Sequence, residues 1–254
     1  MESVPALAPI SVPAPQPECL PAPDSAPAMR VLRLPSTGYG AALALQRRLL
    51  EERLLGLAPD TLILLSHPPI VTLGRGSSAC HVLASEDDLR RRGIELWETD
   101  RGGDVTFHGP GQIVGYVIFD LRIHGQDLHR FLRRIEEAVL RALDELGFSG
   151  VRVPGLTGIW VDGAKVCAIG IKVSRWISMH GFALNVSTDL SYFDVIVPCG
   201  IADRAVTSLE ELRGGPVERG AVENALVRGF AAEYGLDPAP RVGSREARQE
   251  RVVA

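Results

Sequence analysis

The sequence predicts an α+β fold, on the strength of three features of its apolar pattern. Runs with strand-like alternation and stretches with helical spacing are interspersed along the chain. Three strand-like runs at 158–163, 165–171 and 177–186 follow one another closely. Their connections are too short for parallel crossovers, so we expect an antiparallel meander there. A single apolar stripe runs through 127–146, which predicts a long amphipathic helix.

The composition is that of a globular protein. Of 254 residues, 46% are hydrophobic and 23% charged, and the formal net charge is −4. That charge argues against nucleic acid as a partner, and no apolar run reaches the roughly 18 residues of a membrane span. The sequence lacks a signal-peptide pattern and a C-x-x-C zinc pattern, so we expect a cytoplasmic protein with reduced thiols and no bound metal.

We expect three parts along the chain. Residues 1–28 contain eight prolines and no aromatic residue, so they predict a disordered extension. Residues 29–236 show no internal linker and predict one catalytic domain. Residues 237–254 are polar and predict a C-terminal tail.

The first half of the domain alternates short strands and helices. A strand is expected at 30–34 and a helix at 39–57, which ends near a glycine and a proline. Strands follow at 61–66 and 70–76, separated by His67 and two prolines; a histidine in that setting is usually structural. Ser85 can cap a short helix through Arg92. The alternation at 94–99 predicts a half-buried strand.

The second half begins with an apolar strand at 113–121. Asp127 is expected to open the long helix, and Gly147 to end it. After the meander, the segment 196–201 predicts a loop. The stretch 207–212 carries a capping-box pattern for a short helix, and 217–234 predicts the last helix.

The stretch 101–112 stands out as a candidate site. Five of its twelve residues are Gly or Pro, and the others include Arg101, Asp104, Thr106, His108 and Gln112. Glycine lets backbone approach a ligand closely, and polar groups on a loop fixed by a buried strand are where sites tend to be built. The alternative is a structural turn that happens to carry a histidine.

The positions of the cysteines and the small number of lysines limit the reaction classes to consider. Cys199 lies between a proline and a glycine, whereas Cys167 lies within an apolar strand and is expected in the core. A catalytic thiol needs a nearby cation or histidine to lower its pKa, and the candidates are Lys165, His108 and His180. The chain has only two lysines among its 27 basic residues, so a retained lysine suggests a role that arginine cannot fill, such as giving up a proton. The pattern leaves a Cys–His peptidase and a Cys–Lys acyltransferase both open.

The chain resembles the lipoyl(octanoyl) transferases of lipoate biosynthesis. The resemblance is carried by RGGDVTFHGPGQ at 101–112, GIWVDGAKVCAIGIKVSR at 158–175, HGFALNV at 180–186, IVPCGI at 196–201 and HPPIVTLGRG at 67–76. These segments occur in order and span about residues 30–215.

The resemblance implies a mixed β-sheet flanked by helices, as in biotin and lipoate protein ligases. It implies transfer of octanoyl from octanoyl-acyl carrier protein to a lysine on the lipoyl domain of 2-oxoacid dehydrogenase E2 subunits or the glycine cleavage H protein. It assigns Cys199 and Lys165 as a catalytic dyad and requires no cofactor. The substrate-binding residues that it implies are Arg101, Gly102, Gly103, Asp104, Val105, Thr106, Phe107, His108, Ala168, Ile169, Gly170, Gly181, Phe182 and Ala183.

The implied chemistry is consistent with these residue types. A thioester is already activated, so a Cys199 thiolate can displace the carrier thiol and form an acyl-enzyme without ATP. Lys165 can favour the thiolate as a cation, and as a neutral amine it can take a proton from the attacking lysine. The alternatives are an ATP-dependent lipoate or biotin ligase, a cysteine hydrolase, and a non-catalytic module that binds acyl groups or carrier proteins. A pure binding module has no need of both Lys165 and Cys199.

Overall fold

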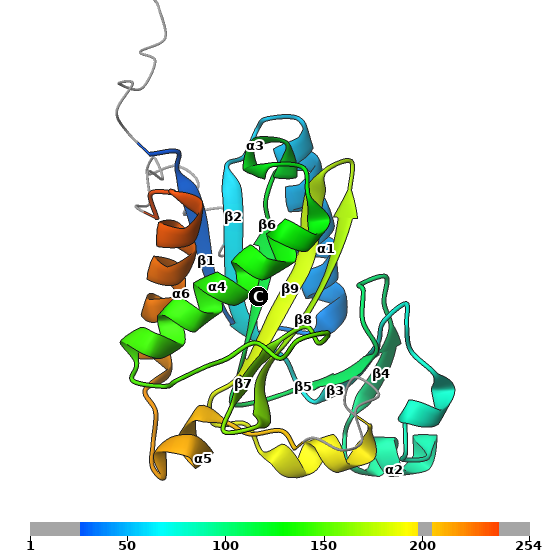
Figure 1. The fold of residues 1–254 in the computed structure, drawn as a ribbon. Helices are drawn as coiled ribbons and strands as arrows, with labels where there is room; N and C mark the ends of the chain where they lie inside the picture. The colour runs from blue at the N-terminus through cyan, green and yellow to red at the C-terminus, as the bar shows by residue number, and fades with distance from the viewer. Residues whose placement is uncertain (1–25, 198–204, 239–254) are drawn as a thin grey trace, which may run out of the picture.

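The structure is a computed structural model that describes residues 26–197 and 205–238 (Figure 1). Its first half contains β1 (Met29–Ser36), α1 (Tyr39–Leu54), β2 (Asp60–Ser66), β3 (Ile70–Leu73), the short 3-10 helix η1 (Ala79–His81), α2 (Glu86–Arg91), β4 (Glu95–Glu98), β5 (Val105–His108) and β6 (Gln112–Ile118). Its second half contains α3 (Leu121–His124), α4 (Leu128–Glu145), β7 (Ile159–Val161), β8 (Ala164–Ser174), β9 (Ile177–Asn185), the 3-10 helix η2 (Leu190–Val195), α5 (Leu209–Arg213) and α6 (Arg219–Tyr234).

A six-stranded sheet forms the centre of the fold, in the order β1-β2-β6-β9-β8-β7. β1 and β2 are parallel and are connected through α1, whereas the other neighbours in this sheet are antiparallel. The expected meander is confirmed, because β7, β8 and β9 are consecutive antiparallel neighbours. The predicted α+β class with a mixed sheet flanked by helices is therefore correct.

Helices cover both faces of this sheet. α4 and α6 lie on one face and α1 on the other (Figure 1). The β2 side chains alternate between the two layers: Leu62 and Leu64 pack in the cluster under α4 and α6, and Ile63 and Leu65 pack in the cluster under α1. A strand that is buried on both faces has a continuous run of apolar residues in its sequence, and β2 has such a run.

Helix α4 crosses α6 at very short range. A Cβ atom placed on Gly229 of α6 would lie 2.2 Å from the carbonyl oxygen of Ala138 on α4. Only a residue without a side chain allows this approach, because real Cβ contacts are longer than 3.0 Å.

The helix caps follow the sequence signals. Ser85, Asp127 and Ser208 each accept a hydrogen bond from a backbone N–H in the first turn of α2, α4 and α5. These contacts satisfy N–H groups that have no partner within the helix, which is why Ser and Asp are favoured there.

A second, three-stranded sheet has the order β4-β3-β5. The prediction of a loop throughout 101–112 is wrong for 105–108, because these residues form β5 and pair antiparallel with β3. The prediction that 94–99 is half-buried is also wrong, because every residue of β4 is exposed. β4 lies at the edge of the small sheet, and its apolar neighbour Ile94 supplies the buried contact instead.

The two ends of the expected domain lie together. Ala28 forms an isolated parallel bridge with Asp237, and the Asp237 N–H donates to the carbonyl of Pro27 at 2.9 Å. These residues fall just outside the expected limits of 29–236. The remainder of the two predicted tails, 1–25 and 239–254, lies outside the described residues. Within the described ranges no helix has the length and apolar character needed to cross a bilayer.

Candidate active site

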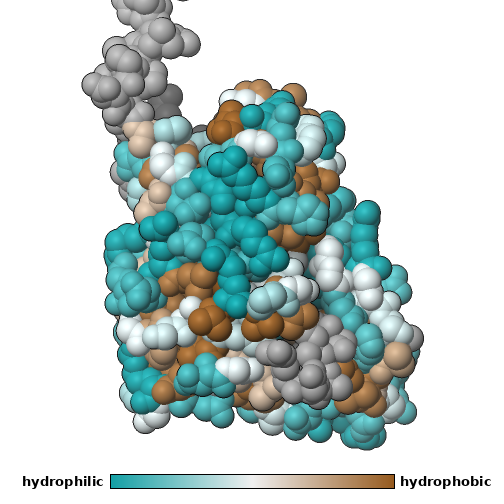
Figure 2. All heavy atoms as spheres, in the orientation of Figure 1, coloured by the Kyte–Doolittle hydropathy of each residue, from teal (hydrophilic) through white to brown (hydrophobic). Residues whose placement is uncertain are grey.

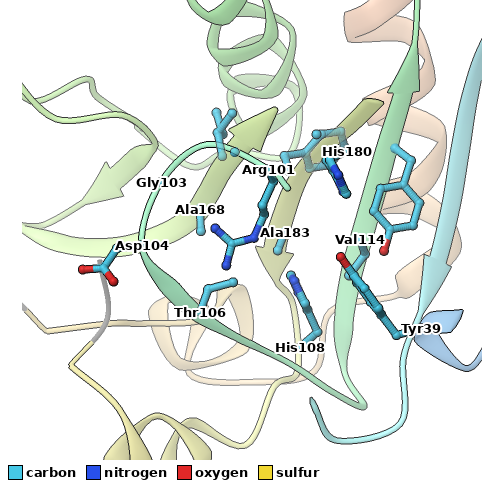
Figure 3. Close-up of a pocket in the computed structure, with 15 residues that line it drawn as sticks. Tyr39, Arg101, Gly103, Asp104, Thr106, His108, Val114, Ala168, His180 and Ala183 are labelled. Atoms are coloured by element: carbon cyan, nitrogen blue, oxygen red, sulfur yellow. The ribbon is translucent and has the colours of Figure 1, made fainter. Parts of the chain in front are cut away.

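A pocket opens where the small sheet meets the face of the large one, and its volume, including space open to solvent, is about 480 Å³. Its walls come from β5, β6, β8, β9, the loop before β5 and the start of α1 (Figure 3). The residues that line it are Tyr39, Arg101, Gly103, Asp104, Thr106, His108, Val114, Tyr116, Ala168, Ile169, Gly170, His180, Gly181, Phe182 and Ala183. The structure thus gathers into one cavity all the predicted substrate-binding residues except Gly102, Val105 and Phe107.

The alternation of β5 explains two of these exceptions. Thr106 and His108 face the pocket, whereas Val105 and Phe107 face the opposite side and belong to the core cluster between the small sheet and η2. Phe107 stacks on Tyr192 there, with ring centroids 4.8 Å apart. Since successive strand residues point to opposite faces, a contiguous motif on a strand cannot line a pocket with every residue.

The third exception, Gly102, holds the loop in place. Its N–H donates to the carbonyl of Ile171 on β8 at 2.8 Å. Its own carbonyl lies so close to Gly170 that a Cβ atom there would be 2.7 Å away.

The Arg101 guanidinium extends into the pocket (Figure 3). One terminal nitrogen donates to both the carbonyl and the hydroxyl of Thr72 on β3, at 2.7 and 2.9 Å. The residue is only 8% exposed. A buried cation fixed in this way can bind a carbonyl oxygen or stabilise a developing oxyanion.

Two carboxylates flank the loop that carries Arg101. Asp104 accepts a hydrogen bond from the N–H of Val105 at 2.7 Å and contacts the ring of His81 at 2.6 Å. Asp100 contacts Lys172 at 2.5 Å and accepts from Nε2 of His180 at 2.9 Å. Burial works to raise the pKa of Asp100, but these two partners outweigh it and lower that pKa to about 2.

His108 is buried and is bonded to Gln112. Its Nδ1 is 2.8 Å from Oε1 of Gln112. Burial, together with the positive charge of Arg101, lowers the pKa of His108 to about 3. The ring therefore offers the pocket an uncharged imidazole at physiological pH.

Sequence reasoning missed part of the pocket lining, namely Tyr39, Val114 and Tyr116. It named His180 only as a possible partner of a thiol; the structure places the ring in the pocket lining, with its Nε2 bonded to Asp100. His67 does not line the pocket: its Nδ1 is bonded to the carbonyl of Thr37 and its Nε2 to the Tyr116 hydroxyl, at 2.5 and 2.7 Å. His67 is fully buried and positions Tyr116, which is a structural role of the kind expected for it.

Lys165 lines a second hollow that adjoins the first. The two share Thr106, Ala168 and Ala183, and the second is completed by Gln112, Lys165, Val166, Asn185, Phe193 and Val206. Lys165 is 8% exposed, and its Nζ lies 5.0 Å from the centre of the Trp160 ring. Its backbone is bonded on both sides, donating to the carbonyl of Ala205 at 2.9 Å and accepting from the N–H of Thr207 at 3.0 Å.

Cys199, the predicted nucleophile, lies outside the described residues. Cys167 is fully buried, and burial raises the pKa of its thiol to about 12, so its assignment to the core is confirmed. Cys80 is exposed and lies 3.0 Å from the Ser78 hydroxyl. The described residues include no group of three His, Cys, Asp or Glu side chains arranged to hold a metal ion.

Comparisons with a family model and with known proteins agree on one family. Residues 38–231 match the lipoyl protein ligase A/B catalytic domain. The octanoyltransferase of Rubrobacter xylanophilus is 52% identical over 214 residues, which cover 83% of this chain and 96% of that protein. The octanoyltransferase of Koribacter versatilis is 47% identical over 207 residues, which cover 80% of this chain and 82% of that protein.

Solved structures show the same fold. A bi-partite lipoate protein ligase from Thermoplasma acidophilum superposes with a TM-score of 0.65 at 19% identity, over 89% of this chain and 91% of that one. A lipoate-protein ligase A bound with ATP gives a TM-score of 0.65 at 19% identity, over 89% of this chain and 93% of that one. At such low identity these structures bear on the fold alone. The family model and the relatives at 47% and 52% identity identify the family: the chain belongs to the octanoyltransferases of the lipoyl protein ligase A/B family.

Proposed function

We propose that the protein transfers an octanoyl group from octanoyl-acyl carrier protein to a lysine of a lipoyl domain, in the synthesis of protein-bound lipoate. The acceptors are the lipoyl domains of 2-oxoacid dehydrogenase E2 subunits and the glycine cleavage H protein. The observation that carries this proposal is the adjacency of the two hollows, because the lining residues that they share place the Arg101 pocket beside the hollow of Lys165.

The pocket walls suit a thioester of an apolar acid. One side is built from the apolar segments 168–170 and 181–183 together with Val114. Arg101 and His108 add polar groups to the same lining. Apolar walls with a few convergent polar groups are typical of small-molecule sites, where the polar groups fix the orientation of the ligand. The octanoyl chain would lie against the apolar walls and the carbonyl would point toward Arg101.

The described residues on either side of 198–204 contact residues of the two hollows. Val197 donates its N–H to the carbonyl of His81 at 2.8 Å, and the His81 ring contacts the pocket residue Asp104. The chain re-enters the described part at Ala205, which is bonded to Lys165.

The proposed reaction has two steps. In the first, the Cys199 thiolate attacks the octanoyl carbonyl, the carbon–sulfur bond to the carrier breaks, and the carrier thiol leaves. In the second, the acceptor amine attacks the enzyme thioester, an amide bond forms and Cys199 is released as a thiolate. Lys165 takes the proton that the amine loses. In the next cycle Lys165 gives this proton to the departing sulfur of the carrier, which leaves as a thiol.

Intact-protein mass spectrometry tests this proposal. Incubation with octanoyl-carrier protein, without ATP or acceptor, should add one octanoyl group that hydroxylamine removes, and a lipoyl domain should then discharge it. Cys199→Ala should abolish both steps, whereas the control Cys167→Ala should retain them. If labelling requires free octanoate and ATP, the protein is a ligase and this proposal is wrong. If the main product is free octanoate, the protein is a hydrolase.

The base role of Lys165 has its own test. Lys165→Arg keeps the positive charge but cannot release a proton near neutral pH. Discharge to the lipoyl domain should fall by roughly 10²–10⁴-fold, the range typical of lost acid–base catalysis. A variant that discharges at the original rate would limit Lys165 to an electrostatic role.

A further inference from the structure

A chain of hydrogen bonds runs beneath the two hollows and ends at His108. The Asn185 side-chain nitrogen donates to the carbonyl of Thr207 at 3.0 Å, and the Asn185 oxygen accepts from Gln112 at 2.9 Å. Gln112 in turn contacts Nδ1 of His108 at 2.8 Å. All four residues are buried. Unmade hydrogen bonds would be costly at such positions, so the chain should keep a single arrangement.

Two backbone carbonyls fix the direction of every bond in this chain. The carbonyl of Thr207 can only accept, so the amide nitrogen of Asn185 points to it and the amide oxygen points to Gln112. The carbonyl of Phe107 likewise accepts from the Gln112 nitrogen, at 3.2 Å. The Gln112 oxygen is therefore the atom that faces His108, and it can only accept. It follows that Nδ1 of His108 carries a hydrogen.

A neutral imidazole with a hydrogen on Nδ1 has a lone pair on Nε2. The neutral state follows from burial and from the neighbouring Arg101, which keep the pKa of His108 low. The ring points from β5 into the pocket (Figure 3), and within the described residues Nδ1 is its bonded nitrogen. His108 therefore presents a hydrogen-bond acceptor to whatever enters the pocket.

We infer that Nε2 of His108 accepts a hydrogen bond from the attacking primary amine, and that Gln112 and Asn185 are positioning residues that hold His108 in the tautomer required. This inference rests on the proposed function. The octanoyl thioester has no donor in its acyl part, so an acceptor in the pocket has no use in the first step. The lysine amine of the second step does carry N–H donors. As a weak base, His108 aligns this amine, while the proton itself passes to Lys165.

Gln112→Glu tests the role of the tautomer. A carboxylate still accepts from Nδ1 of His108, but it cannot donate to the carbonyl of Phe107, and it favours a positive charge on the ring. His108 should then take up a proton and turn Nε2 into a donor. We expect acylation by octanoyl-carrier protein to change by less than about tenfold, and discharge to the lipoyl domain to fall by at least about 10²-fold. The discharge rate should partly recover at higher pH, as the ring loses its extra proton.

Nitrogen-15 NMR of the histidine rings reads the tautomer without any catalytic assay. In the unmodified protein, the signals lost in His108→Gln identify the ring, and they should show hydrogen on Nδ1 alone. Gln126→Glu is the matched amide-to-carboxylate control: Gln126 is exposed and lines neither hollow, so His108 should keep the same tautomer.

Two results would overturn the inference. One is hydrogen on Nε2 of His108 in the unmodified protein. The other is Gln112→Glu discharging octanoyl at the original rate while its His108 ring is doubly protonated. An unmodified protein that forms no octanoyl-enzyme would refute the proposed function instead, and the tautomer of His108 would still be decided by NMR.

Discussion

Gly170→Ala should impair transfer by displacing the loop that carries Arg101. The backbone of Gly170 is in a region open to alanine, so the substitution introduces no torsional strain. Its Cβ atom, however, would lie 2.7 Å from the carbonyl oxygen of Gly102. That carbonyl is part of the backbone, and the neighbouring N–H of Gly102 is bonded to β8 at 2.8 Å, so the clash cannot be relieved by rotating a side chain.

The size of the effect follows from this contact. To reach an ordinary contact of 3.4 Å, the loop must retreat from β8 by about 0.7 Å. The bonds of Arg101 to Thr72, at 2.7 and 2.9 Å, resist that movement or lengthen with it. A misplacement of about 1 Å can cost around 10²-fold in rate, and overpacking typically costs about 1–3 kcal/mol of stability. We therefore expect roughly a 10- to 100-fold slower transfer.

The assay is single-turnover acylation by octanoyl-carrier protein, followed by mass spectrometry, with thermal unfolding measured in parallel. Gly215→Ala is the matched control, because its Cβ atom would meet nothing within 4 Å and its backbone is also open to alanine. Acylation by Gly170→Ala within about threefold of the control would refute the reasoning, since it would mean that the position of this loop does not limit the reaction.

Three further predictions concern stability and reactivity. Gly229→Ala should lower the free energy of unfolding in urea by about 1–3 kcal/mol. Alanine gains about 1 kcal/mol in helix propensity, but separating α4 from α6 costs more than that. An increase in stability would show that the two helices can move apart freely. Cys167→Ala should leave transfer intact and cost roughly 1 kcal/mol, and the native Cys167 thiol should resist alkylating reagents until the protein unfolds. Asp100 has a folded-state pKa of about 2, below its ordinary value, so its contact with Lys172 and His180 stabilises the protein above about pH 4 and is lost as the pH falls from there toward 2. Unfolding of Asp100→Asn should depend less on pH in that window, and an unchanged slope would contradict the assignment.

The sequence predicted the elements whose signals are local. Apolar spacing placed the long helix at 127–146, and the structure has α4 at Leu128–Glu145 with Asp127 as its cap. The meander and the capped helix after Ser208 were also expected from short-range patterns. These features depend on backbone groups and periodicity within a few residues, and such information is present in any sequence.

β5 could not be predicted in the same way. Its four residues lie between two glycine-containing turns, and they become a strand because β3, more than thirty residues earlier, offers a partner edge. The same limit applies to the pocket. Tyr39 comes from the first turn of α1 and Tyr116 from the middle of β6, and neither is marked by a local motif. Tyr39 reaches the pocket through the packing of α1 against the large sheet, and Tyr116 through its place in that sheet.

The Arg101 loop connects the two sheets, and this explains why a site should be built from it. Three backbone bonds tie the loop to the turn after β3: Arg75 to Arg101 at 3.0 Å, Gly76 to Gly103 at 3.0 Å, and Gly74 to Asp104 at 3.3 Å. The bond from Gly102 to β8 ties the same loop to the large sheet.

Such a loop has little freedom, although it is rich in glycine. Gly102 allows close approach to Ile171 of β8, where its N–H is bonded, and Gly103 adopts a positive φ of 87°. The guanidinium of Arg101 is consequently placed by both sheets at once, and His108 at the end of β5 is placed by the small sheet and by Gln112 of the large one. A shift between the sheets would therefore move the cation and the imidazole relative to the pocket residues that β8 and β9 supply. The packing that holds the two sheets together is thus a requirement for the geometry of the site as well as for the stability of the fold.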